Sequence, residues 1–182
     1  TSILDGFVRH AQQAGGDVSL YDSTESGPKP DAVIMVMAEN PYAEGQGDID
    51  TLAWQQGNSR DLALIRQLKD QGIPVVTLFL TGRPMWVNAE MNASDAFVVA
   101  WLPGSEGAAV ADVLLAAPTG AARYDFVGRL PMPWPNHDLN PDNHDFSIVD
   151  FAFPVGFGLT TEIASEWVAL NEQAIGQKQS LD

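Results

Sequence analysis

The sequence contains no cysteine, which excludes disulfides, thiolate nucleophiles and cysteine-bound zinc. Basic residues are also scarce: Lys and Arg total 9 against 24 Asp and Glu, and the formal net charge is -15. Such a surface repels phosphate backbones, so we expect no nucleic-acid partner. No apolar run approaches the ~20 residues that a membrane-spanning helix requires, so we expect no membrane insertion either.

What the sequence does contain is typical of a globular protein. Its 182 residues are 45% hydrophobic and 18% charged. This length and composition suit one domain with a sizeable core, or one domain followed by a tail. The bulk numbers therefore indicate a folded domain and leave its function open.

Three runs that are apolar except for Thr77 predict strands at residues 32–38, 75–80 and 96–101. Because these runs lack polar alternation, each strand is expected to be buried on both faces, as in a parallel sheet covered by helices. A fourth, short strand is predicted at 18–21. The apolar pattern thus favours an α/β fold.

Apolar residues at helical spacing predict four helices. Ser2, Ser59 and Ser105 are the expected N-caps of the first three. The helices are expected over residues 2–14, 59–71, 105–116 and 162–175. Together with the strands they predict a three-layer α/β/α sandwich with a mostly parallel sheet. Residues 118–158, which hold six of the twelve prolines, are expected to be a long irregular segment.

Ligands of wound α/β sheets gather at the carboxyl ends of the strands. Three loops leave those ends here, at residues 39–58, 81–86 and 102–107. The first is about 20 residues long where two to six would be ordinary. Its acidic residues are Glu39, Glu44, Asp48 and Asp50. From composition alone, this loop is either a solvated acidic segment or part of a site.

The third loop offers a serine nucleophile as an alternative. Ser105 follows a predicted strand and precedes a predicted helix, which is where the nucleophile elbow of a serine hydrolase lies. Pro103 occupies a position where that motif has glycine, but His137 and His144 follow as candidate partners. A helix N-cap and a nucleophile are both open for Ser105, and the cap is favoured.

A second alternative is a calcium loop over Asp138, Asn140 and Asp142. A calcium-binding loop of this type has glycine at its sixth position and a bidentate glutamate at its twelfth. Asn143 and Val149 stand at those positions here. The pattern is incomplete, and the sequence does not decide whether calcium binds.

Five motifs occur in order along the chain. They are AENPYAEGQGD at 38–48, VVTLFLTGRPM at 75–85, AWLPGSEGAAVADVLL at 100–115, GRLPMPWP at 128–135 and FPVGFGLTT at 153–161. Together they resemble the C-terminal half of glycoside hydrolase family 3, and within it the exo-1,3/1,4-β-glucanases and β-glucosidases. The resemblance covers nearly all of residues 1–161. It leaves 162–182 as a C-terminal helix, tail or linker.

The resemblance implies an exo-acting enzyme that hydrolyses β-glucosidic bonds of β-glucan oligosaccharides with retention and without a cofactor. In this family a (β/α)8 barrel that carries an Asp nucleophile precedes an (α/β)6 sandwich, and the active site lies between them. The sandwich supplies a Glu acid/base on the loop that reads PYAEGQGD here, which maps the role onto Glu44. Glu39 is then a structural carboxylate.

The resemblance also implies a missing half. The chain has no barrel and lacks the start of the sandwich domain, so we expect a piece of a longer protein that is inactive alone. A periplasmic or extracellular bacterial location is expected. The alternative function is a non-catalytic carbohydrate-binding or interaction domain.

Overall fold

A three-stranded parallel sheet forms the centre of the protein. The structure is a computed structural model, and it describes residues 1–21, 27–55, 60–138, 151–162 and 166–173. The strands lie in the order β1 (Val33–Ala38), β2 (Val75–Leu80) and β3 (Ala96–Val99). In β2 the side chains of Val75, Leu78 and Phe79 are fully buried. The parallel sheet predicted from the three apolar runs is confirmed.

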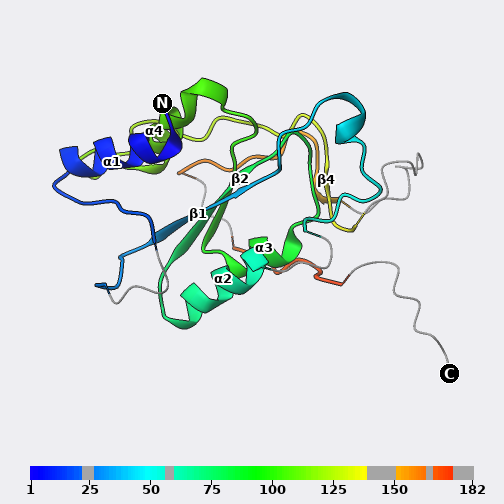
Figure 1. The fold of residues 1–182 in the computed structure, drawn as a ribbon, viewed down its shortest axis with the longest axis horizontal. Helices are drawn as coiled ribbons and strands as arrows, with labels where there is room; N and C mark the ends of the chain where they lie inside the picture. Colours follow the sequence, from blue (N-terminus) through cyan, green and yellow to red (C-terminus); the bar gives the residue numbers. More distant parts are fainter. Residues whose placement is uncertain (22–26, 56–59, 139–150, 163–165, 174–182) are drawn as a thin grey trace.

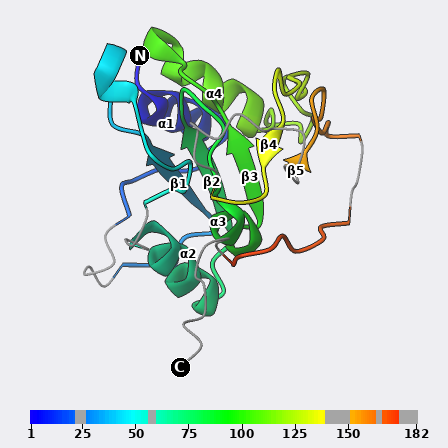
Figure 2. The same ribbon diagram turned by 90° about the vertical axis from the view of Figure 1, so that its right-hand side faces the viewer.

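Helices cover both faces of this sheet (Figures 1 and 2). α1 (Ile3–Gln13) and α4 (Gly107–Leu114) pack together on one face. α2 (Arg60–Asp70) and α3 (Asn88–Ala93) pack together on the other. The three-layer α/β/α sandwich is therefore confirmed. α3 was not predicted, because its six residues carry too short an apolar pattern. In the described part of the chain, no helix is both long and apolar enough to cross a membrane.

The start of α1 is fixed by its own sequence. The Ser2 hydroxyl accepts a hydrogen bond from the Asp5 backbone N–H (3.1 Å), and the Asp5 carboxylate accepts one from the Ser2 N–H (3.0 Å). This reciprocal capping box satisfies two N–H groups that the helix cannot bond itself. The Ser2 cap predicted from the sequence is confirmed. His10, later in the helix, pairs with Asp112 of α4.

Aromatic rings fill the core between the sheet and the long irregular segment. Phe79 of β2 contacts Trp54, Phe97 and Trp134 at centroid distances of 5.0, 5.9 and 6.4 Å. Trp134, only 1% exposed, belongs to β4 (Trp134–Pro135), which pairs antiparallel with β5 (Phe151–Phe153). The segment predicted to be irregular is thus ordered, in its described residues, by placing a tryptophan in the core.

The helix predicted over 162–175 is wrong for the part that the structure describes. Residues 166–173 form neither helix nor strand, and side-chain amides of α3 bind their backbone. Asn92 Nδ2 donates to the Leu170 carbonyl and Asn92 Oδ1 accepts from the Leu170 N–H, both at 2.9 Å. Asn88 Nδ2 donates to the Asn171 carbonyl at 2.7 Å. Contacts with a neighbouring helix have replaced the bonds that a helix would make within itself.

The strand predicted at 18–21 is also wrong: these residues have no strand structure. A strand needs a neighbour to complete its backbone hydrogen bonds. In the described part of the chain the sheet ends at β1. Leu20 is accordingly 81% exposed. Ser59, predicted to cap the second helix, lies outside the described residues.

Candidate functional site

The three loops expected to carry a site come together at the carboxyl ends of the strands. The first loop follows β1, and in Figure 1 its cyan part projects beyond the sheet. The second follows β2 and begins at Thr81, whose backbone N–H donates to the carbonyl of Trp101, the residue before the third loop (3.2 Å). Arg83 of the second loop contacts the first loop at several points. The sequence prediction of a common edge for these loops is therefore met.

Glu39 is held entirely within this edge. Its Oε2 accepts hydrogen bonds from the Thr81 hydroxyl (2.6 Å) and the Gly82 N–H (2.9 Å). Its Oε1 lies 3.1 Å from Arg83 Nε, and the side chain is only 12% exposed. Because both oxygens are engaged, the Glu39 carboxylate ties two loops together, as its structural interpretation implies.

Arg83 extends this network along the first loop. Its Nε also donates to the Tyr42 hydroxyl (3.1 Å), its Nη1 donates to the Gly47 carbonyl (2.7 Å), and its guanidinium carbon lies 4.1 Å from the centre of the Tyr42 ring. We call Glu39, Tyr42, Gly47, Thr81 and Arg83 the Arg83 clamp.

Glu44 lies between the two points where Arg83 touches the loop. It begins the short 3-10 helix η1 (Glu44–Gly47), and its side chain is exposed. Its backbone φ of 49° lies in the left-handed region, which costs an L-residue roughly 1–2 kcal/mol. The loop therefore presents the Glu44 carboxyl outward, whereas the Glu39 carboxyl is tied inward.

Left-handed backbone is concentrated at this edge. Among the described residues, the non-glycine positions with positive φ are Glu44, Gln55 and Trp101. All three lie in the loops at the carboxyl ends of the strands. Backbone strain that the surroundings maintain is typical of functional sites, and the observed outliers support locating a site here.

Ser105 has a different role from the one predicted. It belongs to a 3-10 turn, η2 (Gly104–Glu106), and α4 begins after it with Glu106 as its N-cap and without a side-chain cap. The predicted Ser105 cap is therefore wrong. The Ser105 hydroxyl bonds the neighbouring Glu106 carboxylate (3.0 Å), whereas a serine nucleophile would donate to a histidine. His144 lies outside the described residues.

The possible calcium loop lies mostly outside the described residues. Asp138 is described, while Asn140 and Asp142 lie outside the described residues. Within the described ranges, no three His, Asp or Glu side chains are grouped so that they could hold a metal ion.

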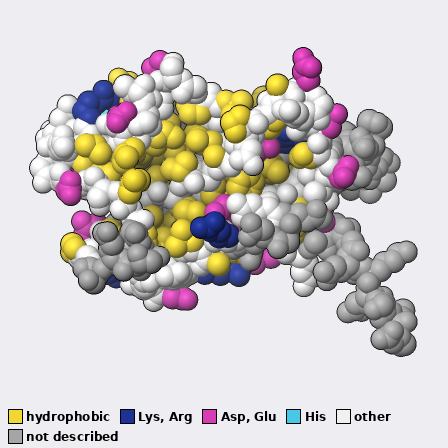
Figure 3. All heavy atoms as spheres, viewed as in Figure 1, with side chains coloured by type: hydrophobic (Ala, Val, Ile, Leu, Met, Phe, Trp, Pro, Cys, Tyr) yellow, Lys and Arg dark blue, Asp and Glu magenta, His cyan; other side chains and the backbone are white. Residues whose placement is uncertain are grey.

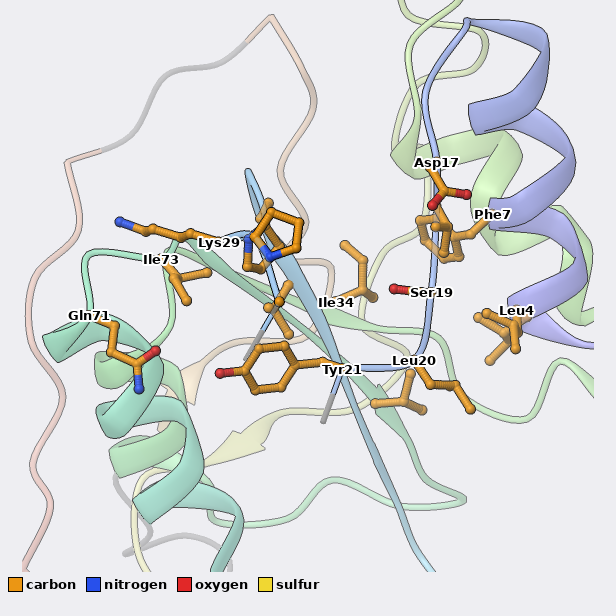
Figure 4. Close-up of a pocket in the computed structure, with 18 residues that line it drawn as sticks. Leu4, Phe7, Asp17, Ser19, Leu20, Tyr21, Lys29, Ile34, Gln71 and Ile73 are labelled. Carbon is orange, nitrogen blue, oxygen red and sulfur yellow. The ribbon is translucent and has the colours of Figure 1, made fainter. Parts of the chain in front are cut away.

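Two hollows flank the sheet. A shallow one of about 420 Å³ lies under the first loop and is lined by Glu39, Tyr42, Trp54 and Arg83 among others. A larger groove of about 750 Å³ lies along the edge of β1 that pairs with no strand among the described residues (Figures 3 and 4). Its lining is mainly apolar, includes Leu4, Phe7 and Ile34, and includes no residue of the three loops. We define it as the β1-edge groove. We place the candidate site at the three loops, beside the first hollow, whose lining includes Tyr42 and Arg83 but not Glu44.

Burial changes the chemistry of one carboxyl away from this site. Glu90 of α3 is 8% exposed, and its burial, together with the negative charges of Asp61 and Glu172, raises the pKa of its carboxyl. Neither Glu90 nor the two carboxylates that affect it belong to the candidate site, so the raised pKa concerns stability.

Residues 1–161 match the family model described as the glycosyl hydrolase family 3 C-terminal domain. An exo-1,3/1,4-β-glucanase from a Pseudoalteromonas species has a solved structure that is 47% identical, with a TM-score of 0.87 over 96% of this chain and 22% of its own. A periplasmic β-glucosidase of Salmonella typhimurium is 28% identical over 78% of this chain and 20% of the relative.

A lysosomal β-glucosidase of Dictyostelium discoideum is 34% identical over 64% of this chain and 13% of its own length. The chain thus spans between 13% and 22% of these three relatives. The family expected from the five motifs is the one that these comparisons identify.

Proposed function

Since the chain belongs to glycosyl hydrolase family 3, through the C-terminal domain of that family, we propose that it supplies the acid/base of a retaining exo-β-glucosidase or glucanase. The acid/base is Glu44. The nucleophile is a carboxylate from a (β/α)8 barrel elsewhere in the same protein. The substrate is a β-glucan oligosaccharide, from whose non-reducing end glucose is released.

The observation that carries this proposal is the contrast between the two glutamates of one loop. Glu39 has both carboxylate oxygens engaged by Thr81, Gly82 and Arg83. Glu44 is exposed at the turn of the loop, on a strained backbone. A proton donor to an external substrate has to be accessible, and of these two carboxyls only Glu44 is.

The chemistry requires a second carboxyl. In a retaining mechanism two carboxyls lie about 5–5.5 Å apart across the scissile bond. The nucleophile attacks the anomeric carbon while Glu44 gives its proton to the departing oxygen. Water then attacks the glycosyl ester, the ester bond breaks, and the proton of water returns to Glu44. A loop of this length lets Glu44 reach a pocket formed by another domain.

The proposal includes the behaviour of the isolated chain and a cellular location. Without the barrel it has no nucleophile to form the covalent intermediate, so residues 1–182 alone are inactive. A periplasmic or extracellular bacterial location is part of the proposal, supported by the periplasmic relative from Salmonella typhimurium.

The test is Glu44→Ala in the complete protein, with Asp48→Ala on the same loop as the matched control. We expect turnover of alkyl glucosides, which need protonation of the leaving group, to fall about 10²–10⁴-fold. Glucosides with activated aryl leaving groups need little protonation, so their first step is less affected. Azide should restore the second step and yield a glucosyl azide.

Equal losses on both substrate types, without rescue by azide, would refute the assignment of Glu44. Unchanged turnover in the Glu44→Ala protein would instead favour a non-catalytic role for the loop. Asp48→Ala should lack the leaving-group dependence in either case.

A further inference from the structure

We propose that Arg83 is a positioning residue that fixes the loop carrying Glu44 and so sets the direction in which Glu44 presents its carboxyl. This inference rests on the proposed function of Glu44. It adds a residue from a different loop to that function, together with the contacts through which it acts.

The guanidinium of Arg83 contacts the loop on both sides of Glu44. Two residues before Glu44, it contacts the hydroxyl and the ring face of Tyr42. Three residues after Glu44, it donates to the Gly47 carbonyl at 2.7 Å. The left-handed turn at Glu44 therefore lies between Tyr42 and Gly47, and the planar guanidinium of Arg83 fixes the separation of these two residues.

The Arg83 backbone is itself fixed by contacts with Thr81. Its backbone N–H donates to the Thr81 hydroxyl (3.1 Å), and that hydroxyl lies 2.6 Å from both the Arg83 carbonyl and Glu39 Oε2. Thr81 is fully buried and directly follows β2. The clamp thus extends from the most buried strand of the sheet to the exposed loop.

Two glycines make room for the clamp to close. A Cβ at Gly82 would lie 2.4 Å from the Tyr42 hydroxyl, and a Cβ at Gly47 would lie 2.6 Å from Tyr42 Cδ2. Neither glycine has a left-handed backbone, so space and not conformational freedom explains them. The Tyr42 ring lies between these backbones and the guanidinium, and 39% of the residue remains exposed.

The chemistry of the clamp requires arginine. The same side chain approaches a carboxylate, a phenol, a carbonyl and a ring face, and the planar guanidinium presents several donors in one fork. A lysine ammonium is a point charge that can pair with Glu39 but cannot reach all of these groups at once. Arg83→Lys is therefore expected to keep the ion pair and lose the grip on Gly47.

Positioning of this kind affects proton transfer more than binding. A displacement of a catalytic group by about 1 Å can cost 10²-fold in rate. In the complete protein, Arg83→Met should lower kcat on alkyl glucosides by about that factor. KM should change little, and activated aryl glucosides should be affected less. The loss should disappear in a Glu44→Ala background.

The second measurement does not depend on activity. Hydrogen exchange of the backbone amides at 42–48 should accelerate in Arg83→Met, while exchange in β2 should be unchanged. Arg66→Met is the matched control, because Arg66 is an arginine that bonds Glu172 (3.2 Å) and makes none of the contacts of the clamp. It should change neither the exchange at 42–48 nor the leaving-group dependence.

Unchanged exchange at 42–48 in folded Arg83→Met would overturn the proposal whatever the activity. A different result concerns the activity. If Arg83→Met accelerates exchange at 42–48 but lowers kcat equally on alkyl and activated aryl glucosides, while Glu44→Ala shows the leaving-group dependence, the positioning role is overturned. If Glu44→Ala shows no leaving-group dependence, the proposed function fails and the inference fails with it. The exchange data still test whether Arg83 fixes residues 42–48. If Arg83→Met does not fold, Gly47→Ala is the substitute test, because the added Cβ displaces Tyr42 while the guanidinium stays intact.

Discussion

Three glycines at and after α1 give a quantitative test of the packing between the two helices on one face of the sheet. Gly6 lies where α1 crosses α4: a Cβ there would lie 2.7 Å from both Cα and O of Ala108. Both are backbone atoms, so neither can rotate away. Gly6→Ala therefore forces the two helices apart.

The size of the effect follows from two opposing contributions. Alanine in place of glycine within a helix stabilises by about 1 kcal/mol through propensity. Overpacking of a close contact costs about 1–3 kcal/mol, and a clash with rigid backbone belongs at the upper end. We expect Gly6→Ala to lower the free energy of unfolding by about 2 kcal/mol, which corresponds to a fall in Tm of about 4–8 °C for a domain of this size.

Gly16 and Gly15, at the end of the same helix, are the controls. At Gly16 an added Cβ would lie 3.6 Å from its nearest neighbour, an ordinary contact, and φ is not left-handed. Gly16→Ala should be neutral or stabilise by up to about 1 kcal/mol through the unfolded state. Gly15 has open space around it but a φ of +77°, so Gly15→Ala should cost about 1–2 kcal/mol through backbone strain alone.

The assay is urea unfolding followed by tryptophan fluorescence, with calorimetry for Tm. A Gly6→Ala protein as stable as the parent would refute the close contact between α1 and α4. Equal effects at Gly6 and Gly16 would show that helix propensity outweighs packing here.

Two other predictions concern stability and association. Because burial raises the pKa of Glu90 above its ordinary value of 4.5, ionising this carboxyl opposes folding, and its contribution to stability falls as pH rises from 4.5 through the raised pKa. Glu90→Gln should therefore increase Tm more at about pH 8 than at about pH 4.5, and equal gains at both pH values would contradict the burial argument. Val36 lies on β1, the last strand of the sheet in the described part of the chain, and is 44% exposed in the β1-edge groove. The 182-residue chain should therefore self-associate through this edge in analytical ultracentrifugation. Val36→Lys should weaken that association, whereas Val127→Lys at another exposed position should not.

The sequence predicted the elements whose residues determine their own structure. The runs that became β1, β2 and β3 are apolar except for Thr77, and the parallel sheet that they predict is formed. β2 is largely buried as expected, whereas Val36 of β1 is 44% exposed, so the expected burial of β1 on both faces is wrong. The capping box at Ser2 and Asp5 defines a helix start from local hydrogen bonds alone. For β2 and for the start of α1, the local signal and the tertiary environment agree.

The errors occur where contacts distant in sequence decide. The apolar spacing around Leu170 indicates a helix, but Asn92 binds both backbone groups of Leu170 and competes with helical bonding. The strand pattern at 18–21 needs a neighbouring strand, and the described part of the chain places none beside it. α3 is too short to be detected, yet Asn88 and Met91 within it are buried and held by packing.

The candidate site shows the same division. Composition identified an acidic loop and left Glu39 and Glu44 equivalent; the family resemblance chose Glu44. The geometry distinguishes the two carboxyls independently, because one is bonded on both oxygens and the other is exposed. The sequence placed Arg83 in the second of the three loops but could not predict its contacts, because it lies 41 residues from Tyr42 in sequence and these contacts depend on the pairing of β1 with β2.

Under the proposed function, the long loop has to satisfy two requirements that oppose each other. A carboxyl that acts in a pocket formed by another domain must project from its own sheet, and a projecting loop loses the packing that would hold it still. The left-handed turn at Glu44 adds a cost of roughly 1–2 kcal/mol. Hydrogen bonds that involve a charged group contribute about 1.5–3 kcal/mol each, and Arg83 makes them to Tyr42 and Gly47 across that turn. The clamp can therefore offset the strain and transfer the rigidity of β2 to Glu44. A loop with the same glutamate but without the arginine would reach as far and would hold the proposed proton donor less accurately.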